Sequence, residues 1–311
     1  MSLLNSRVSR RTALVAGGGG ALVAAVAAAA GSSPAAANDD DEVPVVPVVL
    51  TDAGFSMRST VRAGLVTFKV STPEQTYHAL QGFRLENGGT VTDIVEALRG
   101  GVGDDAAAAA AGHRTLLAKA TLVGGAVGPQ NGPIYVSIVL DPGTYYFLDL
   151  NDYFLEGLAN PRVHELRAVG ERGRIRLPAF DETISAVMME HEGGHEGFGF
   201  AVPAELPRQG TYLMFNATDE IHDIAWRQAR PGITDAYLDT FYDAVLNGTP
   251  RPASPWLEGN THGLQGVSPA RWAVVSIGLP AGNYATVCYV PSDETGIPHT
   301  YTGMHRMVQM V

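Results

Sequence analysis

The 311-residue sequence has a single cysteine, Cys288, so no intrachain disulfide can form. Lysine is almost as scarce, with two residues, and 21 Lys and Arg stand against 32 Asp and Glu, a formal net charge of −11. Binding of a polyanion needs clustered basic side chains, so this balance argues against DNA or RNA as a partner. After residue 37 the sequence has no apolar run long enough to span a bilayer as a helix.

Glycine and proline, in contrast, are abundant, with 36 and 19 residues, and 45% of the chain is hydrophobic. The hydrophobic content excludes wholesale disorder, and the turn-forming residues favour a β protein with many short strands. The length is comfortable for two domains. The composition therefore predicts an acidic, turn-rich, two-domain β protein.

Residues 1–37 are typical of an export signal. A positive region with Arg7, Arg10 and Arg11 precedes the apolar stretch Ala13–Ala30, and three alanines at 35–37 offer a cleavage site. The run Ser9–Leu14 resembles a twin-arginine signal, which directs translocation of proteins that are already folded.

An ordinary secretory signal or an uncleaved anchor are the alternatives, but four consecutive glycines at 17–20 weigh against a membrane-spanning helix. Cleavage removes three Arg and no acids, which leaves 18 basic and 32 acidic residues, a charge of −14. Residues 38–46, with the run NDDDE, then form an acidic and flexible start. We expect a protein of the periplasm or cell exterior, without stable membrane insertion after cleavage.

The rest of the chain contains a weak internal repeat. The run Ala63–Val70 followed by His78 matches Gln209–Phe215 followed by His222, and Pro142-Gly143 later matches Ala281-Gly282. The interval from His to the second Gly is 65 positions in one half and 60 in the other. A repeat of this length indicates two copies of one domain. We place the domains at 47–175 and 176–311, with the boundary near 173–178.

β-rich runs and turn signals alternate about every ten residues, as in a sandwich. Three such runs are Thr67–Val70, Tyr135–Val139 and Trp272–Ile277, and the Pro-Gly and Ala-Gly pairs fit tight hairpin turns. Helical insertions are expected around Thr90–Leu98 and at Thr234–Val245, where Ala236, Leu238, Phe241, Tyr242 and Val245 lie near one face. Ala106–Ala111 fits either a short helix or a loop. The predicted fold class is all-β.

The last connection between strands carries the most specific chemistry. Ten residues separate Cys288 from His299, and four separate His299 from Met304, while His222 follows an upstream strand. A thiolate and two imidazoles form a trigonal set suited to copper, with a thioether as a weak, long fourth ligand. These residue types in this order point to a type 1 copper site.

The chain here resembles the cupredoxin (blue copper) family, specifically secreted two-repeat cupredoxin-like proteins. The resemblance covers roughly 45–311 and is carried by the Leu279–Tyr284 approach to Cys288, the C-x10-H-x4-M spacing and the Gly303-Met304 pair. It implies tandem cupredoxin-like Greek-key β-sandwiches with short helical insertions. It also implies one copper, with His222, Cys288 and His299 as equatorial ligands and Met304 as the axial ligand.

Two departures from the family pattern concern the surroundings of this set. His222 is followed by Asp223 where many cupredoxins have Asn, which affects the support of the ligand loop. In the first repeat His78 matches His222 and His164 matches His299, but Asp149 stands at the Cys288 position and Val169 at that of Met304. We interpret the first domain as a degenerate copy, structural or partner-binding, with at most a weak N/O metal site from His78, Asp149 and His164.

Two alternatives keep the sandwich without electron transfer. A lone Cys is often a small buried hydrophobe, which leaves a metal-free binding or structural protein. Met304, Met307 and Met310 recur every third residue and could form a Cu(I) docking strip for copper trafficking. In a terminal strand Met304 and Met310 share one face and Met307 takes the other, so core packing explains much of this pattern.

Two enzymatic readings are disfavoured by the residues. His191-Glu192-Gly193-Gly194-His195 matches the HExxH zinc-protease pattern, but two central glycines suit a helix poorly and both flanks are strand-like. Oxidases couple a blue copper site to further coppers through His beside the Cys, whereas Val287 and Tyr289 flank Cys288 and no His-x-His pair occurs. We therefore expect no catalytic residues and no enzyme, but one-electron transfer with an unidentified redox partner protein.

Overall fold

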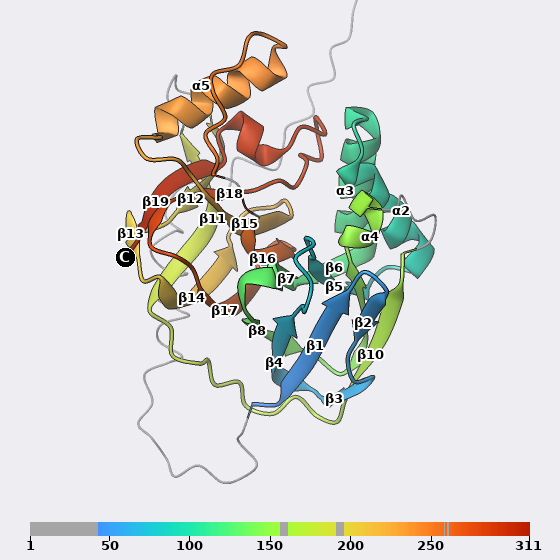
Figure 1. Ribbon diagram of the computed structural model, residues 1–311. Helices are drawn as coiled ribbons and strands as arrows, with labels where there is room; N and C mark the ends of the chain where they lie inside the picture. The colour runs from blue at the N-terminus through green and yellow to red at the C-terminus, as the bar shows by residue number, and fades with distance from the viewer. Residues whose placement is uncertain (1–42, 156–160, 191–195, 258, 260) are drawn as a thin grey trace, which may run out of the picture. The chain divides into compact units, whose positions relative to one another are not determined.

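The computed structural model describes residues 43–155, 161–190, 196–257, 259 and 261–311, and Val43–Val311 form one compact unit. Within it the strands assemble into two β-sheets with a few helices beside them (Figure 1). The predicted all-β sandwich with short helical insertions is thereby confirmed. Among the described residues no helix is both long and apolar enough to cross a membrane.

The first sheet has eight strands in the order β12-β11-β14-β17-β8-β4-β1-β2. Their bounds are β1 Val45–Thr51, β2 Gly54–Ser56, β4 Gly64–Ser71, β8 Ile134–Leu140, β11 Glu182–Glu190, β12 Glu196–Ala201, β14 Gln209–Asn216 and β17 Trp272–Gly278.

The second sheet has eleven strands, ten of them in the order β13-β19-β18-β15-β16-β6-β5-β9-β10-β3, and β7 pairs with β16. Their bounds are β3 Thr60–Arg62, β5 Leu80–Leu85, β6 Ala120–Gly124, β7 Ala126–Val127, β9 Gly143–Asp149, β10 Val163–Val169, β13 Glu205–Leu206, β15 His222–Gln228, β16 His262–Val267, β18 Gly282–Val287 and β19 His305–Met310.

In each sheet the strands of the second half repeat the order of the strands of the first half, counted inward from the opposite edge. In the first sheet β1 pairs in parallel with β4 and β4 antiparallel with β8, while β11 pairs in parallel with β14 and β14 antiparallel with β17. Antiparallel pairing of β8 with β17, at Val136↔Val275 among other positions, joins the two series in the middle. In the second sheet the antiparallel pairing of β6 with β16, at Val123↔Val267, makes the same connection, so both sheets are continuous through the two halves of the chain.

The core lies between the sheets and follows from the alternation of the strands. Every second residue of β1 is fully buried, namely Val46, Val48 and Leu50. Across the core, the rings of Phe68 in β4 and Phe147 in β9 lie 5.1 Å apart, and those of Tyr212 in β14 and Trp226 in β15 lie 5.0 Å apart. Aromatic pairs thus connect the sheets in each half of the chain.

The Pro-Gly and Ala-Gly turns do not form the expected hairpins. Gly143 and Gly282 have φ values of 151° and 147°, which favour glycine, but each turn carries the chain from the first sheet to the second. β9 pairs with β5 and β10 rather than with β8, and β18 pairs with β15 and β19 rather than with β17. A tight turn can close a hairpin or a corner between layers, and its sequence alone does not distinguish the two.

Four α-helices and two short 3₁₀ helices are present in the described residues. Their bounds are α2 Val91–Val102, α3 Ala106–Lys119, α4 Asn151–Leu155, α5 Asp235–Leu246, η3 Pro129–Asn131 and η4 His299–Thr302. Side-chain caps begin the three long helices: Thr90 and Asp93 form a capping box for α2, Asp105 caps α3 and Thr234 caps α5.

The helices cover the outer face of the second sheet. Ile94 of α2 and Leu116 of α3 share a buried apolar cluster with Phe83 of β5 and Leu122 of β6. The Ala106–Ala111 run, left open by the sequence, is thus the start of a helix. In α5 the buried residues are Leu238, Tyr242 and Ala244, whereas Ala236 is exposed and Phe241 and Val245 are half-buried. The predicted helix is confirmed, with its buried face displaced.

The proposed domain boundary falls in residues 170–181, which lack helix and strand. The boundary itself stays a prediction. The strand-like flanks of the HExxH pattern are confirmed, because β11 and β12 pair antiparallel from Glu190↔Glu196 onward. The pattern at 191–195 lies outside the described residues.

Gly112 provides a test of how closely α2 and α3 pack. A Cβ at this position would overlap the carbonyl oxygen of Ala97, whereas a Cβ at Gly101 of α2 would meet nothing closer than 3.9 Å. Gly112→Ala should lower the free energy of unfolding by about 1–3 kcal/mol despite the better helix propensity of Ala. The matched Gly101→Ala should leave it unchanged or raise it by up to about 1 kcal/mol. Urea unfolding measures both, and equal effects would contradict this packing.

Candidate metal centre

Three donor atoms from separate segments meet in one buried place. The Nδ1 atom of His222 lies 3.4 Å from Sγ of Cys288, and Nδ1 of His299 lies 3.5 Å from the same sulfur. All three residues are at most 1% exposed. Their ligand atoms lie within 4.8 Å of one another, so the structure brings together the three equatorial residues expected from the sequence.

The ends of neighbouring strands position these donors. His222 is the first residue of β15, Cys288 directly follows β18, and β15 pairs antiparallel with β18 through Ala225↔Val287. His299 begins η4, and the carbonyl of Cys288 accepts from the backbone N–H of Thr300. A strand pair and one short loop thus fix all three side chains at one end of the sheet.

The spacing of the donors suits a shared metal ion. Two ligands about 2.0–2.3 Å from one metal, at a trigonal or tetrahedral angle, lie roughly 3.6 Å apart. The observed N–S separations of 3.4 and 3.5 Å are close to this value. Burial and the nearby Asp223 raise the pKa of the Cys288 thiol well above its usual range. A metal bound here therefore has to displace the thiol proton.

Glu220 holds the outer nitrogen of His299. Its Oε2 lies 3.0 Å from Nε2 of His299 and accepts from the backbone N–H of Asp293 at 3.0 Å. Burial alone would raise the pKa of Glu220, but the hydrogen bonds from His299 and Asp293 outweigh it, so this pKa is lowered. A carboxylate on the outer nitrogen keeps Nδ1 of His299 free for a metal. No role for Glu220 was predicted from the sequence. Its position two residues before His222 was the pattern that could have indicated one.

The environment of His222 differs. Its Nε2 atom is buried without a hydrogen-bond partner among the described residues. Burial and the neighbouring His299 hold the pKa of His222 well below its usual range, which keeps the imidazole neutral. The ring of Phe198 lies edge-on to both imidazoles, with centroids 4.8 Å from His222 and 5.0 Å from His299. This ring shields the donors from solvent.

Asp223 stabilises the start of the ligand loop. Its Oδ1 accepts from the backbone N–H of Tyr289, the residue after Cys288, at 2.9 Å. Burial raises the pKa of Asp223 to about 6. The departure from Asn noted in the sequence therefore leaves a hydrogen-bond acceptor in place beside the thiol.

Met304 lies in the same core as Cys288 and is fully buried. Its backbone N–H donates to the carbonyl of His299 at 2.9 Å, which ties the expected axial residue to an equatorial one. Met310 is also buried and Met307 is half-buried. This arrangement agrees with the packing interpretation of the C-terminal methionines rather than with an exposed docking strip.

His113, from α3 in the first half of the chain, also reaches this centre. Its Nδ1 donates to the carbonyl of Pro291, and its Nε2 accepts from the backbone N–H of Ile221 at 3.1 Å. Burial lowers the pKa of His113, in keeping with this neutral form. One side chain thus connects the segment before His222 with the loop after Cys288. Nothing in the sequence motif indicated this contact.

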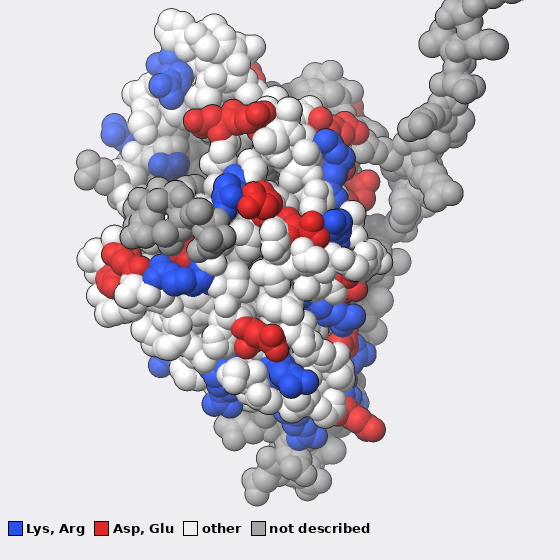
Figure 2. All heavy atoms as spheres, turned by 90° about the vertical axis from the view of Figure 1, so that its right-hand side faces the viewer, with Lys and Arg blue, Asp and Glu red and all other residues white. Residues whose placement is uncertain are grey.

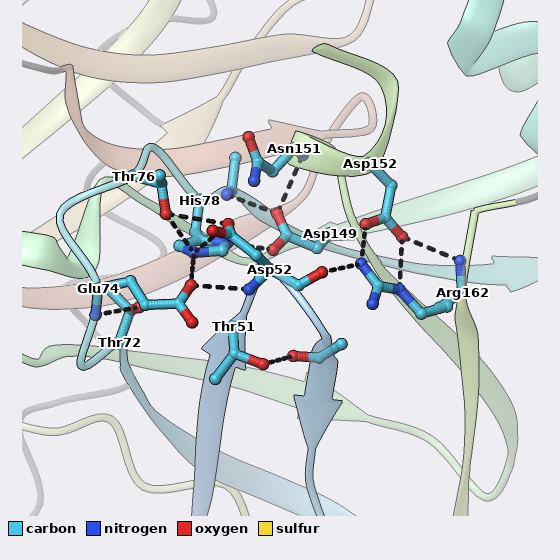
Figure 3. A network of polar contacts seen from close by, with 12 residues as sticks. Thr51, Asp52, Thr72, Glu74, Thr76, His78, Asp149, Asn151, Asp152 and Arg162 are labelled. Carbon is cyan, nitrogen blue, oxygen red and sulfur yellow. Dashed lines mark hydrogen bonds and ion pairs between the residues drawn. The ribbon is translucent and has the colours of Figure 1, made fainter. Parts of the chain in front are cut away.

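The corresponding place in the first half holds a different cluster (Figure 3). Nδ1 of His78 lies 2.6 Å from Oδ2 of Asp149, and its Nε2 lies 3.2 Å from Glu74 and 3.8 Å from Asp52. Burial alone would lower the pKa of His78, but the Asp149 and Glu74 carboxylates more than offset it, so the pKa is raised. An imidazolium donating to carboxylates on both sides satisfies this cluster.

His164 does not join that cluster. Its Nε2 lies 3.3 Å from the carbonyl of Arg58. Asp149 is fully engaged, because its Oδ1 accepts from the backbone N–H groups of Ala79 and Asn151. The weak N/O site considered for His78, Asp149 and His164 is therefore not assembled, and the carboxylates that do approach Nε2 of His78 are those of Asp52 and Glu74.

Neither the protein-family models nor the curated proteins contain a match to this chain. Among solved structures, reduced auracyanin from Roseiflexus castenholzii is similar, with 16% identity over 42% of this chain and 95% of that chain, at a TM-score of 0.25. A multicopper oxidase matches with 10% identity over 90% and 93% of the two chains (TM-score 0.23). The blue copper oxidase of Nitrosomonas europaea matches with 10% identity over 86% and 85% (TM-score 0.22).

The expected resemblance to cupredoxins is confirmed at the level of the fold. Because the TM-scores are low, this assignment of a cupredoxin-like fold rests on the two facing sheets and on the group of candidate ligands described above. His222, Cys288, His299 and Met304 fit a type 1 copper site. The expectation that the protein is not an enzyme is contradicted by the oxidase matches, which span most of the chain, and we withdraw it. The similarity itself assigns no reaction to this chain.

Glu220→Gln tests the support of His299. Gln can still accept a hydrogen bond from Nε2 but carries no charge, so we expect copper affinity to fall roughly 10–100-fold. Competition with a chromophoric chelator measures the affinity. Glu205→Gln, at an exposed position of β13, is the matched control and should change nothing. Equal affinities of the two variants would show that Glu220 plays no part in holding the ligand.

The raised pKa of His78 predicts a dependence of stability on pH. The folded protein holds this proton at higher pH than the unfolded chain, so its stabilising effect is complete below the unfolded pKa, about 6.5. The effect is lost as pH rises through the folded pKa. The free energy of unfolding of the wild type minus that of His78→Gln should therefore shrink between pH 6 and pH 9. Urea unfolding across this range measures the difference, and a constant value would contradict a proton shared with Asp149.

Proposed function

We propose that the protein is an exported one-electron transfer protein with a single type 1 copper, bound by His222, Cys288, His299 and Met304. The observation that carries this proposal is the convergence of two imidazole Nδ1 atoms on one buried sulfur, at 3.4 and 3.5 Å. A copper ion in this set would accept and release one electron. A thiolate with two imidazoles and a weak thioether is the donor set of such sites.

The residues around the donors would keep the donor atoms in nearly the same positions in both oxidation states of a bound copper ion. Glu220 fixes His299, Asp223 fixes the residue after Cys288, and His113 braces the loop from the other half of the chain. Phe198 excludes water from both imidazoles. A buried and braced donor set keeps its geometry when the charge of a bound ion changes.

One copper per chain is the stoichiometry that the two clusters support. In the first half, Asp149 stands in contact with His78 as Cys288 does with His222, but at 2.6 Å the pair is a direct hydrogen bond. The described part of the first half supplies no thiol, since Cys288 is the sole cysteine of the chain. We propose that the first domain is structural and carries no type 1 site.

We also propose that the two domains arose by duplication. The mirrored strand order supports this, as does a pair of equivalent hydroxyl contacts. Thr67 Oγ1 lies 2.8 Å from Ser137 Oγ between β4 and β8, and Thr211 Oγ1 lies 2.8 Å from Ser276 Oγ between β14 and β17. Export rests on the sequence of residues 1–37, and the electron partner is proposed to be another protein outside the cytoplasm.

Cys288→Ser tests the site. Serine lacks the thiolate that gives type 1 copper its intense colour, so the variant should lose the blue band and keep the fold. The matched control is His164→Gln, which removes the imidazole that the repeat aligns with His299 and should keep the full band. Visible absorption of the copper-loaded proteins and their circular dichroism give the two readouts. A Cys288→Ser protein that remains blue would refute the assignment.

A further inference from the structure

A cavity of about 520 Å³ lies beside the ligand loop, between the helices of the first half and the end of the second sheet. One wall consists of α2 and α3, with Leu98, Val102 and Leu116 among its apolar side chains. The opposite wall is the segment from Tyr289 to Pro291, directly after Cys288. The volume is within the range of small-molecule sites, about 300–1,000 Å³.

Two residues that line the cavity are sequence neighbours of candidate ligands. Tyr289 on its wall is the neighbour of Cys288, and Asp223 is the neighbour of His222. These two wall residues are joined by the hydrogen bond from the Tyr289 N–H to Asp223. His113 also lies on the wall and donates to the carbonyl of Pro291. A molecule in the cavity therefore contacts the same residues that hold the ligand loop.

The lining determines the kind of molecule that fits. It is mostly aliphatic, it includes no Lys or Arg, and its single carboxylate, Asp223, already accepts a hydrogen bond. Anions find no positive partner there, and a charged molecule loses its hydration on entry. Gln265 offers hydrogen bonds to a carbonyl or hydroxyl group, whereas the Tyr289 hydroxyl already accepts from Arg227 at 3.2 Å. At about 30 Å³ per heavy atom, as in liquid water, there is room for roughly 15 non-hydrogen atoms.

We propose that this cavity binds an uncharged, largely apolar small molecule against the ligand loop. The helices α2 and α3 then have a function beyond covering the sheet, because they form the wall that the sandwich alone would lack. The effect of the bound molecule on copper rests on the function proposed above, whereas its binding does not require a metal.

The probe for the experiment is prodan, an uncharged naphthalene ketone whose emission moves to shorter wavelength in apolar surroundings. We expect the metal-free protein to bind it saturably, one per chain. Gly101→Phe and Leu98→Trp fill the cavity from α2 and should weaken binding at least tenfold. Thr92→Phe, at an exposed position of α2 outside the cavity lining, is the matched control and should bind like the wild type. Circular dichroism verifies that each variant is folded.

Failure of saturable binding by the wild type would overturn the proposal, and so would unchanged binding by both filled variants. In the copper-loaded protein, prodan should shift the blue band of the wild type and of Thr92→Phe but not that of Gly101→Phe. A protein that binds prodan and takes up no copper retains the cavity site and refutes the proposed function. A blue protein that binds no prodan refutes the cavity site and retains the proposed function.

Discussion

The antiparallel pairing of β8 with β17 is the constraint on which the rest of the structure depends. It joins the strands of the two halves into one continuous first sheet, as the pairing of β6 with β16 does in the second sheet, and a single core lies between the two sheets. Without this pairing each half would leave a strand edge with unsatisfied hydrogen-bonding groups. As a consequence, helices inserted in the first half come into contact with the ligand loop of the second, and His113 bonds both Ile221 and Pro291.

The metal centre combines soft donors with a low-dielectric surrounding. Cys288, His222 and His299 are almost completely buried, which holds the thiol protonated and the His222 imidazole neutral when no metal is present. The two imidazoles are supported unequally, because Glu220 bonds the outer nitrogen of His299 while that of His222 has no partner among the described residues. The His299 ring is therefore oriented by its hydrogen bond to the Glu220 carboxylate. The His222 ring is oriented by packing and by its position at the start of β15.

The grouping of the candidate ligands was predictable from sequence because Cys288, His299 and Met304 lie close together in the chain, where spacing limits geometry. The helices expected around Thr90–Leu98 and at Thr234–Val245 were predictable for the same reason, because their sequence patterns are local. Contacts across the chain were not predictable: no local pattern places His113 beside Pro291, 178 positions away, or sets Gly143 and Gly282 at corners between sheets. The prediction that the protein is not an enzyme relied on absent motifs, and it was wrong.

Cu(II) titration of the metal-free protein, followed by visible absorption, tests the central claim most directly. The convergence of two Nδ1 atoms on the Cys288 sulfur predicts an intense blue band that grows linearly and saturates at one copper per chain. A protein that stays colourless with excess Cu(II), while its thiol remains reduced, would contradict the account.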